Sequence, residues 1–244
     1  MKRRNFMKSV TLAAVAAGSF PVMAAGRGEY SYEELIGKGT PGLFGDGIQL
    51  RLEASRAFEE MRKAAAGEGI GIKIVSGYRT FRRQKAIWER KYQAYTENGM
   101  EPSKAIDRII EYSTIPGTSR HHWATDIDII DERVSFSGND LLNTANYEGN
   151  GAFSDLKNWM DKNAAAYGYY LAYTDRPGRR GFYYEPWHYS YAPLSVPMLR
   201  AYRELDVKAI ITREKVAGAL YFTDGFIDRY TEENILDINP VLLP

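Results

Sequence analysis

The sequence predicts an α+β fold with a few short strands and a larger number of helices. Segments 70–75 and 126–130 alternate in polarity and are rich in β-branched residues, as half-buried strands are. Longer segments, such as 81–96, place apolar residues at helical spacing. The helices and strands segregate along the chain instead of alternating strictly, which favours α+β over an α/β fold.

The first half of the chain is predicted to hold three helices and one strand. Residues 49–66 have helical spacing, and the strand over 70–75 follows them. A turn over 76–80 leads into the helix over 81–96. A shorter helix is expected from Pro102 to Tyr112, with its proline in the first turn.

The second half is predicted to hold three strands and two helical regions. The strand over 126–130 is followed by a helix over 153–167, which ends at a glycine. Segments 169–173 and 181–185 resemble two strands joined by a Pro-Gly turn. Residues 196–234 are expected to be largely helical.

Composition bounds the class of protein. The 244 residues suit one globular domain with extensions, or two small domains at most. With 44% hydrophobic and 13% aromatic residues, the chain can bury a sizeable core. It has no cysteine, which excludes disulfides, thiolate metal ligands and cysteine nucleophiles.

Residues 1–25 have the composition of a signal peptide. They combine a charged start over 2–4, an apolar run over 10–17 and small residues over 22–25 that suit cleavage. The apolar run is too short to span a bilayer comfortably. Segment 3–8 resembles the twin-arginine export signal. We therefore expect a periplasmic or otherwise extracytoplasmic protein with no membrane span in the mature chain.

The net charge argues against a nucleic-acid partner. The whole chain carries +1, and the leader contributes four of its cations and no acid. Without the leader, 28 basic residues face 31 acidic ones. A slightly acidic protein of this kind does not bind nucleic acid through its bulk charge.

Two of the three histidines stand in a pattern typical of a catalytic zinc site. His121 precedes Asp128 by seven residues, and His188 follows Glu185 by three. Two imidazoles and one carboxylate, with a water in the fourth position, form a common catalytic zinc centre. A structural zinc normally has four protein ligands. We therefore infer one zinc ion, with Glu185 beside it as a general base.

The spacing of these residues constrains the backbone. Residues seven apart on a flat strand face opposite sides, so a loop must bring His121 to a metal shared with Asp128. Glu185 and His188 would also point opposite ways on a regular strand. Pro186 between them favours a bend that directs both side chains into one site.

The ordered set of motifs resembles the M15 metallopeptidases, which include the VanY-type D-alanyl-D-alanine carboxypeptidases. Residues 119–128 are similar to the family motif SxHxxGxAxD, and residues 185–188 are similar to its glutamate followed by Trp-His. Residues 76–80, with Gln84, resemble the stretch SGYRS…Q. Each motif is weak alone, whereas the set in family order is specific, and it covers about 45–195.

The resemblance implies a small antiparallel sheet flanked by helices, with a zinc site in a groove, as in the LAS or hedgehog-like peptidase fold. It implies that His121, Asp128 and His188 hold one zinc ion and that Glu185 is the base. It also implies that Arg79 meets the substrate, as a cation near the scissile carbonyl or the terminal carboxylate. Further residues expected to line the groove are Ser119, Tyr78, Gln84 and Trp187.

Two positions depart from the family pattern. Ala124 stands where the family has glycine, which we interpret as a minor steric change. Asp126 stands where the family has a small alanine, and it shares a strand face with Asp128, so periodicity alone does not choose the ligand. The motif register favours Asp128, and Asp126 is a candidate for orienting a ligand histidine. His122 is interpreted as a structural or rim residue.

The implied activity is hydrolysis of the terminal D-Ala–D-Ala bond in peptidoglycan stem peptides. An L,D-carboxypeptidase or an endopeptidase on the same scaffold is the first alternative, and a non-catalytic cell-wall-binding module is the second. The expected organisation is a signal peptide (1–25), a peptidase domain (26–200) and a helical C-terminal extension (201–244). The sequence does not specify the oligomeric state or the role of the extension.

Overall fold

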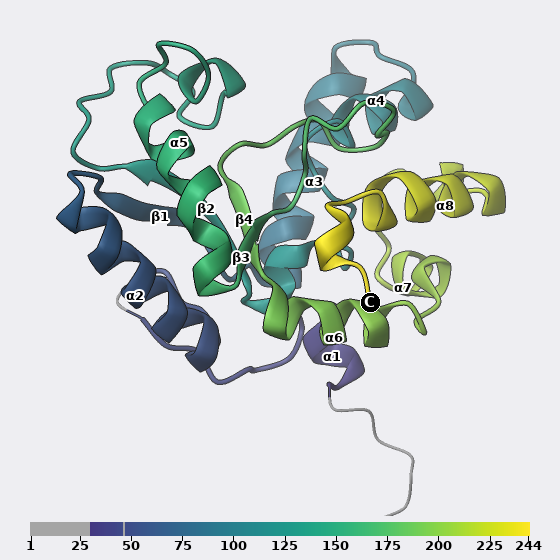
Figure 1. Cartoon of the computed structure of the whole chain (residues 1–244). Coiled ribbons are helices and arrows are strands. Elements are labelled where there is room, and N and C mark those ends of the chain that lie inside the picture. The colour runs from purple at the N-terminus through teal and green to yellow at the C-terminus, as the bar shows by residue number, and fades with distance from the viewer. Residues whose placement is uncertain (1–29, 46) are drawn as a thin grey trace, which may run out of the picture.

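A computed structural model describes residues 30–45 and 47–244, so the signal-peptide prediction lies outside the described residues. The α+β prediction is confirmed: four antiparallel strands form one sheet in the order β1-β2-β4-β3, with helices around it (Figure 1). The strands are β1 (Ile72–Ser76), β2 (Asp126–Asp131), β3 (Tyr169–Leu171) and β4 (His188–Tyr191).

Apart from the short helix α1, which was not predicted, the helices lie close to their predicted positions. The α-helices of the described chain are α1 (Tyr32–Leu35), α2 (Leu52–Gly67), α3 (Phe81–Glu97), α4 (Pro102–Ile109), α5 (Ser154–Asn163), α6 (Ala192–Tyr202), α7 (Val207–Arg213) and α8 (Asp224–Tyr230). Two further turns matter below, the 3₁₀ turn η1 (Arg120–Trp123) and the π-helical turn η5 (Thr231–Leu236). In this part of the chain, no helix has the length and apolarity needed to cross a bilayer.

One face of the sheet packs on α2 and α5. Ile127 and Ile129 of β2 are fully buried there, together with Phe58 of α2 and Trp159 of α5. Because side chains alternate along a strand, Asp126 and Asp128, which alternate with these isoleucines, face the other way. The sheet therefore turns an apolar face to α2 and α5 and a charged face to the site described below.

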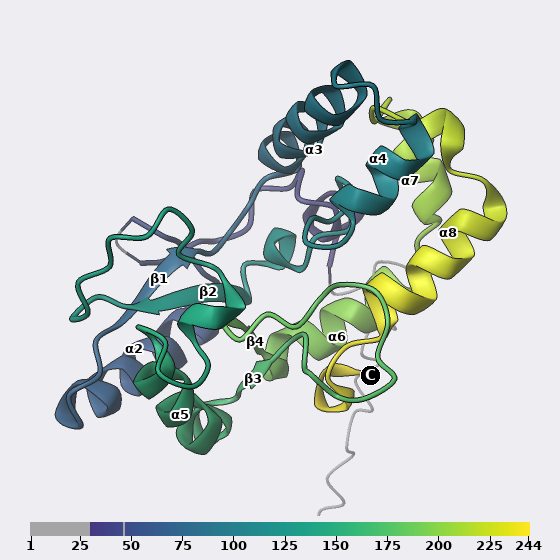
Figure 2. The ribbon, with the colours of Figure 1, turned by 90° about the horizontal axis from the view of Figure 1, so that it is seen from above.

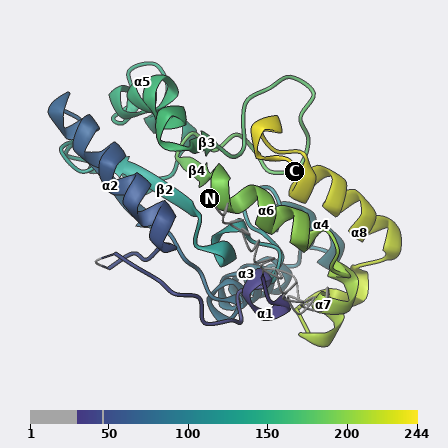
Figure 3. The ribbon, with the colours of Figure 1, turned by 60° about the horizontal axis from the view of Figure 1, so that its bottom comes forward.

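A second apolar core joins the remaining helices. Trp88 of α3, Tyr202 of α6 and Tyr230 of α8 are all buried in it. Figure 2 shows α3, α4, α7 and α8 grouped on the side away from α2 and α5. Helix α6 continues directly from β4 and leads from the sheet to α7 (Figure 3). The helical C-terminal segment thus packs on the rest of the protein, and α6 runs across residue 200 without a break.

One predicted strand is wrong. Residues 181–185 form no strand, and β3 pairs with β4 instead. The backbone turns away at Gly181, which has φ +78°, and a Cβ added there would clash with the backbone of Glu233. The segment is held by the C-terminal part of the chain, a contact that local alternation does not reveal.

Candidate metal centre

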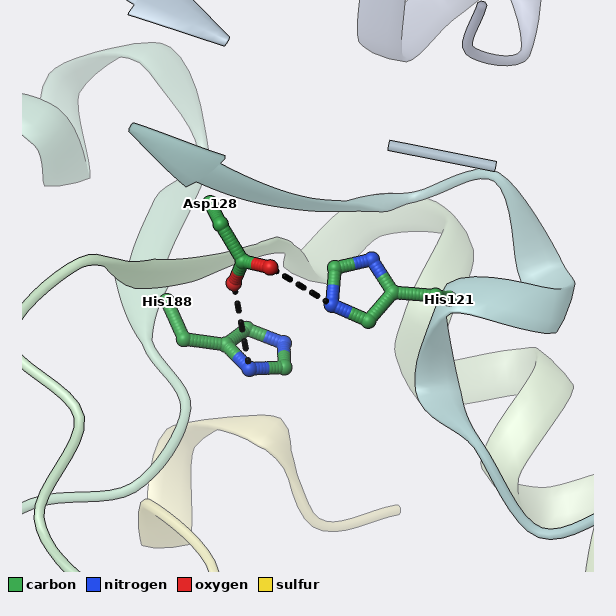
Figure 4. A group of neighbouring side chains, drawn as sticks. All are labelled: His121, Asp128 and His188. Carbon is green, nitrogen blue, oxygen red and sulfur yellow. Dashed lines mark ion pairs between the residues drawn. The ribbon is translucent and has the colours of Figure 1, made fainter. Parts of the chain in front are cut away.

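Two strands and one turn bring the three predicted ligands together. Asp128 on β2 and His188 on β4 are direct cross-strand partners, so their side chains share a face of the sheet. His121 comes from η1, which ends at Ala124 in the left-handed conformation, with φ +57°. That residue reverses the chain into β2 and brings His121 over the strand, as the sequence spacing requires. Figure 4 shows the three side chains converging.

The three side chains can hold a metal ion. One ligand atom from each of His121, Asp128 and His188 lies within 4.8 Å of the others, and all three residues are buried. His121 Nε2 is 3.3 Å from Asp128 Oδ2, and His188 Nδ1 is 3.7 Å from Asp128 Oδ1 (Figure 4). The histidine nitrogens and the carboxylate oxygens therefore surround one common point, where a single metal ion would fit.

The remaining contacts of these residues fit a zinc ion. Asp128 Oδ1 is buried and has no hydrogen-bond partner in the described chain. Each histidine uses its other ring nitrogen elsewhere: His121 Nδ1 lies 2.9 Å from the carbonyl of Gly77, and His188 Nε2 lies 3.0 Å from Asp126 Oδ1. The atoms that face one another are His121 Nε2, His188 Nδ1 and the Asp128 carboxylate oxygens, and His188 Nδ1 also lies 2.9 Å from Glu185 Oε2. Two imidazole nitrogens and a carboxylate oxygen form a donor set that zinc prefers.

Asp126 is occupied by other partners. Arg120 Nε donates to its Oδ1 at 2.8 Å, and Ser190 Oγ donates to its Oδ2 at 2.9 Å. With His188 Nε2 as a further neighbour, both oxygens of this fully buried carboxylate are engaged. The two aspartates of β2 therefore differ in geometry: Asp128 lies with His121 and His188 in a group that could hold a metal ion, whereas Asp126 contacts His188 Nε2.

The charges at this site perturb one another. Burial alone would lower the pKa of His188, but the hydrogen bonds to Asp126 and Glu185 raise it to about 10. Burial would raise the pKa of Asp128, yet His121 and His188 hold it at about 2. Arg120 and His188 likewise hold the pKa of Asp126 well below its usual range despite its burial. His188 and the two aspartates of β2 thus shift one another's pKa in the direction that favours the charged forms.

Glu185 lies beside the metal position, as its predicted role requires. Its Oε2 is 2.9 Å from His188 Nδ1. The backbone turns tightly between the two residues, because the His188 N–H donates to the Glu185 carbonyl at 3.0 Å. The bend expected at Pro186 thus directs both side chains into one site.

Arg79 is held firmly at the edge of the same site. It donates from Nη1 to Gln84 Oε1 and from Nη2 to Ser76 Oγ, each at 2.9 Å. Its Nη2 is also 4.0 Å from Asp128 Oδ2. Gln84 is fully buried behind the guanidinium, so it positions Arg79 instead of lining the cavity itself.

A cavity of about 640 Å³ opens onto these residues. Its lining includes the predicted residues Arg79, Ser119, His121, Asp128, Glu185, Trp187 and His188. Tyr78 lines a neighbouring cavity instead, together with Arg79 and Asp128, and its hydroxyl donates to the carbonyl of Gly39 at 3.3 Å. The groove is therefore close to the predicted one, with Tyr78 and Gln84 placed outside its wall.

His122 is a structural residue in the interior and not a rim residue. Its Nε2 accepts a hydrogen bond from the Gly117 N–H at 3.2 Å, so its Nδ1 carries the proton and donates to the Arg79 carbonyl at 2.6 Å. Burial lowers the pKa of His122 to about 3, which keeps the ring neutral. His122 thus fixes the backbone of Arg79 behind the site.

Parts of the cavity wall were not predicted from the sequence. Tyr173 packs edge-on against His188, with ring centroids 5.1 Å apart. Phe182, from the segment predicted as a strand, and Lys91 of α3 also line the cavity. No sequence motif surrounds these three residues, so only the folded structure shows that they line the cavity.

Residues 47–194 match the sequence model of the VanY family, described as D-alanyl-D-alanine carboxypeptidase. This match covers more than half of the chain and includes every residue of the metal centre. The protein therefore belongs to the VanY family of the M15-like peptidases.

Two curated relatives illustrate the relationship. A D-alanyl-D-alanine carboxypeptidase of Enterococcus faecalis is 25% identical over 171 residues, which are 70% of this chain and 58% of that protein. The Bacillus subtilis protein YodJ, named as a carboxypeptidase, is 30% identical over 164 residues, which are 67% of this chain and 50% of that protein. The chain thus spans about half the length of these curated relatives.

A solved structure shares the fold. The vancomycin resistance D,D-pentapeptidase VanY from the VanB-type cassette, solved as a mutant with Zn(II), aligns with a TM-score of 0.50 and 21% identity. The alignment covers 75% of this chain and 90% of that one. The peptidase fold expected from the motifs is confirmed.

Proposed function

We propose that this protein is a zinc-dependent D-alanyl-D-alanine carboxypeptidase that hydrolyses the terminal peptide bond of peptidoglycan stem peptides. The observation that carries the proposal is the convergence of His121, Asp128 and His188 within 4.8 Å, with the Glu185 carboxylate beside them. The family to which the chain belongs, and the zinc in the related VanY structure, support this choice of metal and reaction.

The residues around the metal position can divide the reaction between them. A bound zinc ion supplies Lewis-acid polarisation of a carbonyl and a lowered water pKa. Glu185 lies where it can take a proton from the attacking water and then deliver one to the departing amine. Arg79, fixed by Gln84 and Ser76, stabilises negative charge that develops on the scissile carbonyl oxygen.

A substitution of Glu185 tests the assigned base. Glu185→Gln keeps the size of the side chain and removes the carboxylate that exchanges the proton, so turnover should fall by about 10²–10⁴-fold while zinc stays bound. Activity of zinc-loaded Glu185→Gln close to that of the wild type would refute the assignment.

The products identify the bond that is cut. Isolated muropeptides are incubated with the zinc-loaded protein and analysed by mass spectrometry. Loss of one terminal alanine from pentapeptide stems is the expected result. Loss of alanine from tetrapeptide stems would indicate an L,D-carboxypeptidase, cleavage of cross-links an endopeptidase, and no product a non-catalytic wall-binding protein.

We also propose that the protein is exported and acts outside the cytoplasm. The leader over 1–25, with Arg3 and Arg4, supports export by the twin-arginine route. Changing both arginines to lysine should leave the protein inside the cell in a fractionation assay. Unchanged export of that variant would contradict the route.

A further inference from the structure

The loop that leads into η1 is held by residues that lie beyond the family match. Residues 115–118, called the 115–118 loop below, are all buried and come just before η1, which carries the ligand His121. The family model matches the chain only up to residue 194. Nevertheless, Tyr202 of α6 and Tyr230 of α8 both form hydrogen bonds with this loop. The C-terminal helices therefore contact the segment from which a metal ligand emerges.

The hydroxyl of Tyr230 joins the two ends of the 115–118 loop. Thr118 Oγ1 donates to the Ile115 carbonyl at 2.8 Å. Because a threonine hydroxyl has only one proton, the Tyr230 hydroxyl is the donor in its own 2.8 Å bond to Thr118 Oγ1. The Tyr230 oxygen also accepts from the Ile115 N–H at 3.1 Å. One buried phenol thus satisfies a donor and an acceptor of the loop and fixes its shape.

The middle of the same loop is held from both sides. The Tyr202 hydroxyl donates to the Gly117 carbonyl at 2.8 Å, and the Gly117 N–H donates to His122 Nε2 at 3.2 Å. Gly117 has φ +93°, and a Cβ there would lie 3.0 Å from Cγ2 of Ile210 on α7. The loop therefore takes its path between η1 and the C-terminal helices, with little room to shift.

The position of His121 depends on the segments that flank η1. This turn has only four residues, so it lacks the internal stiffness of a longer helix. On one side, the His121 carbonyl accepts from the Arg79 N–H at 3.0 Å, and the His121 ring contacts the Gly77 carbonyl. On the other side, the chain enters η1 directly from the 115–118 loop. A displacement of that loop would therefore move the imidazole relative to Asp128 and His188.

From these contacts we infer that Tyr230 is a positioning residue for the metal ligand His121, which makes the helical C-terminal segment part of the catalytic unit. The inference rests on the metal centre of the proposed function and adds a role for residues outside the family match. Without the phenol hydroxyl, the buried Ile115 N–H loses its partner and Thr118 Oγ1 loses a donor. The loop then rearranges, and a ligand that is displaced by a fraction of an ångström binds the metal less tightly.

Removal of a single hydroxyl from the full chain tests this role. Tyr230→Phe keeps the ring, and its affinity for zinc, measured by competition with a chromophoric chelator, should fall about 10-fold. At saturating zinc, kcat should also fall about 10-fold with little change in KM, because the loop does not touch the substrate. Thr118→Val breaks the same contact from the loop side. The double variant should lose no more zinc affinity than the weaker single variant, since both changes remove one interaction.

A matched control separates positioning from general stability. Tyr169 is buried in the core on the other face of the sheet, and its hydroxyl donates to the Ala54 carbonyl at 2.7 Å. Tyr169→Phe should shift the urea midpoint about as much as Tyr230→Phe but leave zinc affinity unchanged. An unchanged zinc affinity in Tyr230→Phe, or an equal loss in Tyr169→Phe, would overturn the inference; if Tyr230→Phe does not fold, Thr118→Val decides by the same criterion. A wild type that binds no zinc would overturn the proposed metal centre as well, so the two failures are distinguishable.

Discussion

The metal side of the cavity and its loop wall are built from different kinds of contact. The metal side consists of η1, β2 and the segment 185–190, where the charged groups are buried and pair with one another. The loop wall consists of residues 174–183, which carry Phe182 and are tied to the C-terminal segment. The Asp237 carboxylate accepts one hydrogen bond from the Arg176 side chain at 2.8 Å and another from the Arg180 N–H at 2.5 Å.

This difference implies that the metal side determines the chemistry of the site and that the loop wall determines the shape of the cavity. On the metal side, each charge depends on a buried neighbour, so removal of one group leaves another uncompensated in a medium of low polarity. The loop wall relies on ion pairs that are partly open to water, and such pairs contribute little individually. Changes on the metal side should therefore abolish function, whereas changes in the loop wall should adjust it.

The largest effect is expected from a metal ligand. Asp128→Asn removes the ionised oxygen that has no other partner, so stoichiometric zinc and activity should both be lost, activity by about 10³-fold or more given the several kcal/mol that a metal contributes. Zinc content by elemental analysis and peptide hydrolysis measure this. Asp131→Asn, on the same strand, is the control and should retain both; full zinc occupancy in Asp128→Asn would count against the ligand assignment.

A smaller effect is expected from the pair that orients His188. Removing Asp126 alone would leave Arg120 buried and unpaired, so both are replaced in Arg120→Met/Asp126→Ala. Loss of the carboxylate that holds the His188 ring should weaken zinc binding by about 10–100-fold. Competition with a chromophoric chelator gives the zinc affinity of the variant. An affinity equal to that of the wild type would show that Asp126 does not orient His188 for zinc binding.

A substitution in the loop wall should change KM without changing the affinity for zinc. Asp237→Ala releases the loop that carries Phe182 into the cavity. Ion pairs of this exposure contribute up to about 1 kcal/mol, so KM should rise about two- to fivefold while zinc affinity stays constant. Asp228→Ala removes an exposed acid of α8 as the control. A large loss of zinc in Asp237→Ala would erase the distinction between the two regions.

The smallest effect concerns the turn that leads from η1 into β2. Ala124 adopts φ +57°, a conformation that costs a non-glycine residue about 1–2 kcal/mol. Ala124→Gly removes this strain but loosens the unfolded chain, so the free energy of unfolding should rise by about 0.5–1 kcal/mol. Urea denaturation measures it. Ala64→Gly within α2 should instead destabilise by about 1 kcal/mol, and a similar loss in Ala124→Gly would contradict the strain.

The metal side could be predicted from sequence because its determinants are local. Asp126 and Asp128 alternate with isoleucines on β2, and Glu185 lies one turn from His188. The choice between the two aspartates needed the fold, because only the cross-strand neighbour Ser190 and the buried Arg120 show which carboxylate is already occupied.

The loop wall could not be predicted because its contacts are distant in sequence. Segment 181–185 alternates like a strand, yet Arg179 and Arg180 bind the backbone and side chain of Asp237, more than fifty residues away. The positive φ at Ala124 shows a similar limit: the family position occupied by glycine was interpreted as a matter of size, whereas the constraint lies in the backbone.

The central claim is that His121, Asp128 and His188 hold zinc while Asp126 holds the far side of the His188 ring. Anomalous diffraction at the zinc edge, from crystals of the zinc-loaded protein, tests it most directly. The account predicts one ion bonded to His121 Nε2, a carboxylate oxygen of Asp128 and His188 Nδ1. An ion bonded to Asp126 or to His188 Nε2, or no ion at these residues, would contradict it.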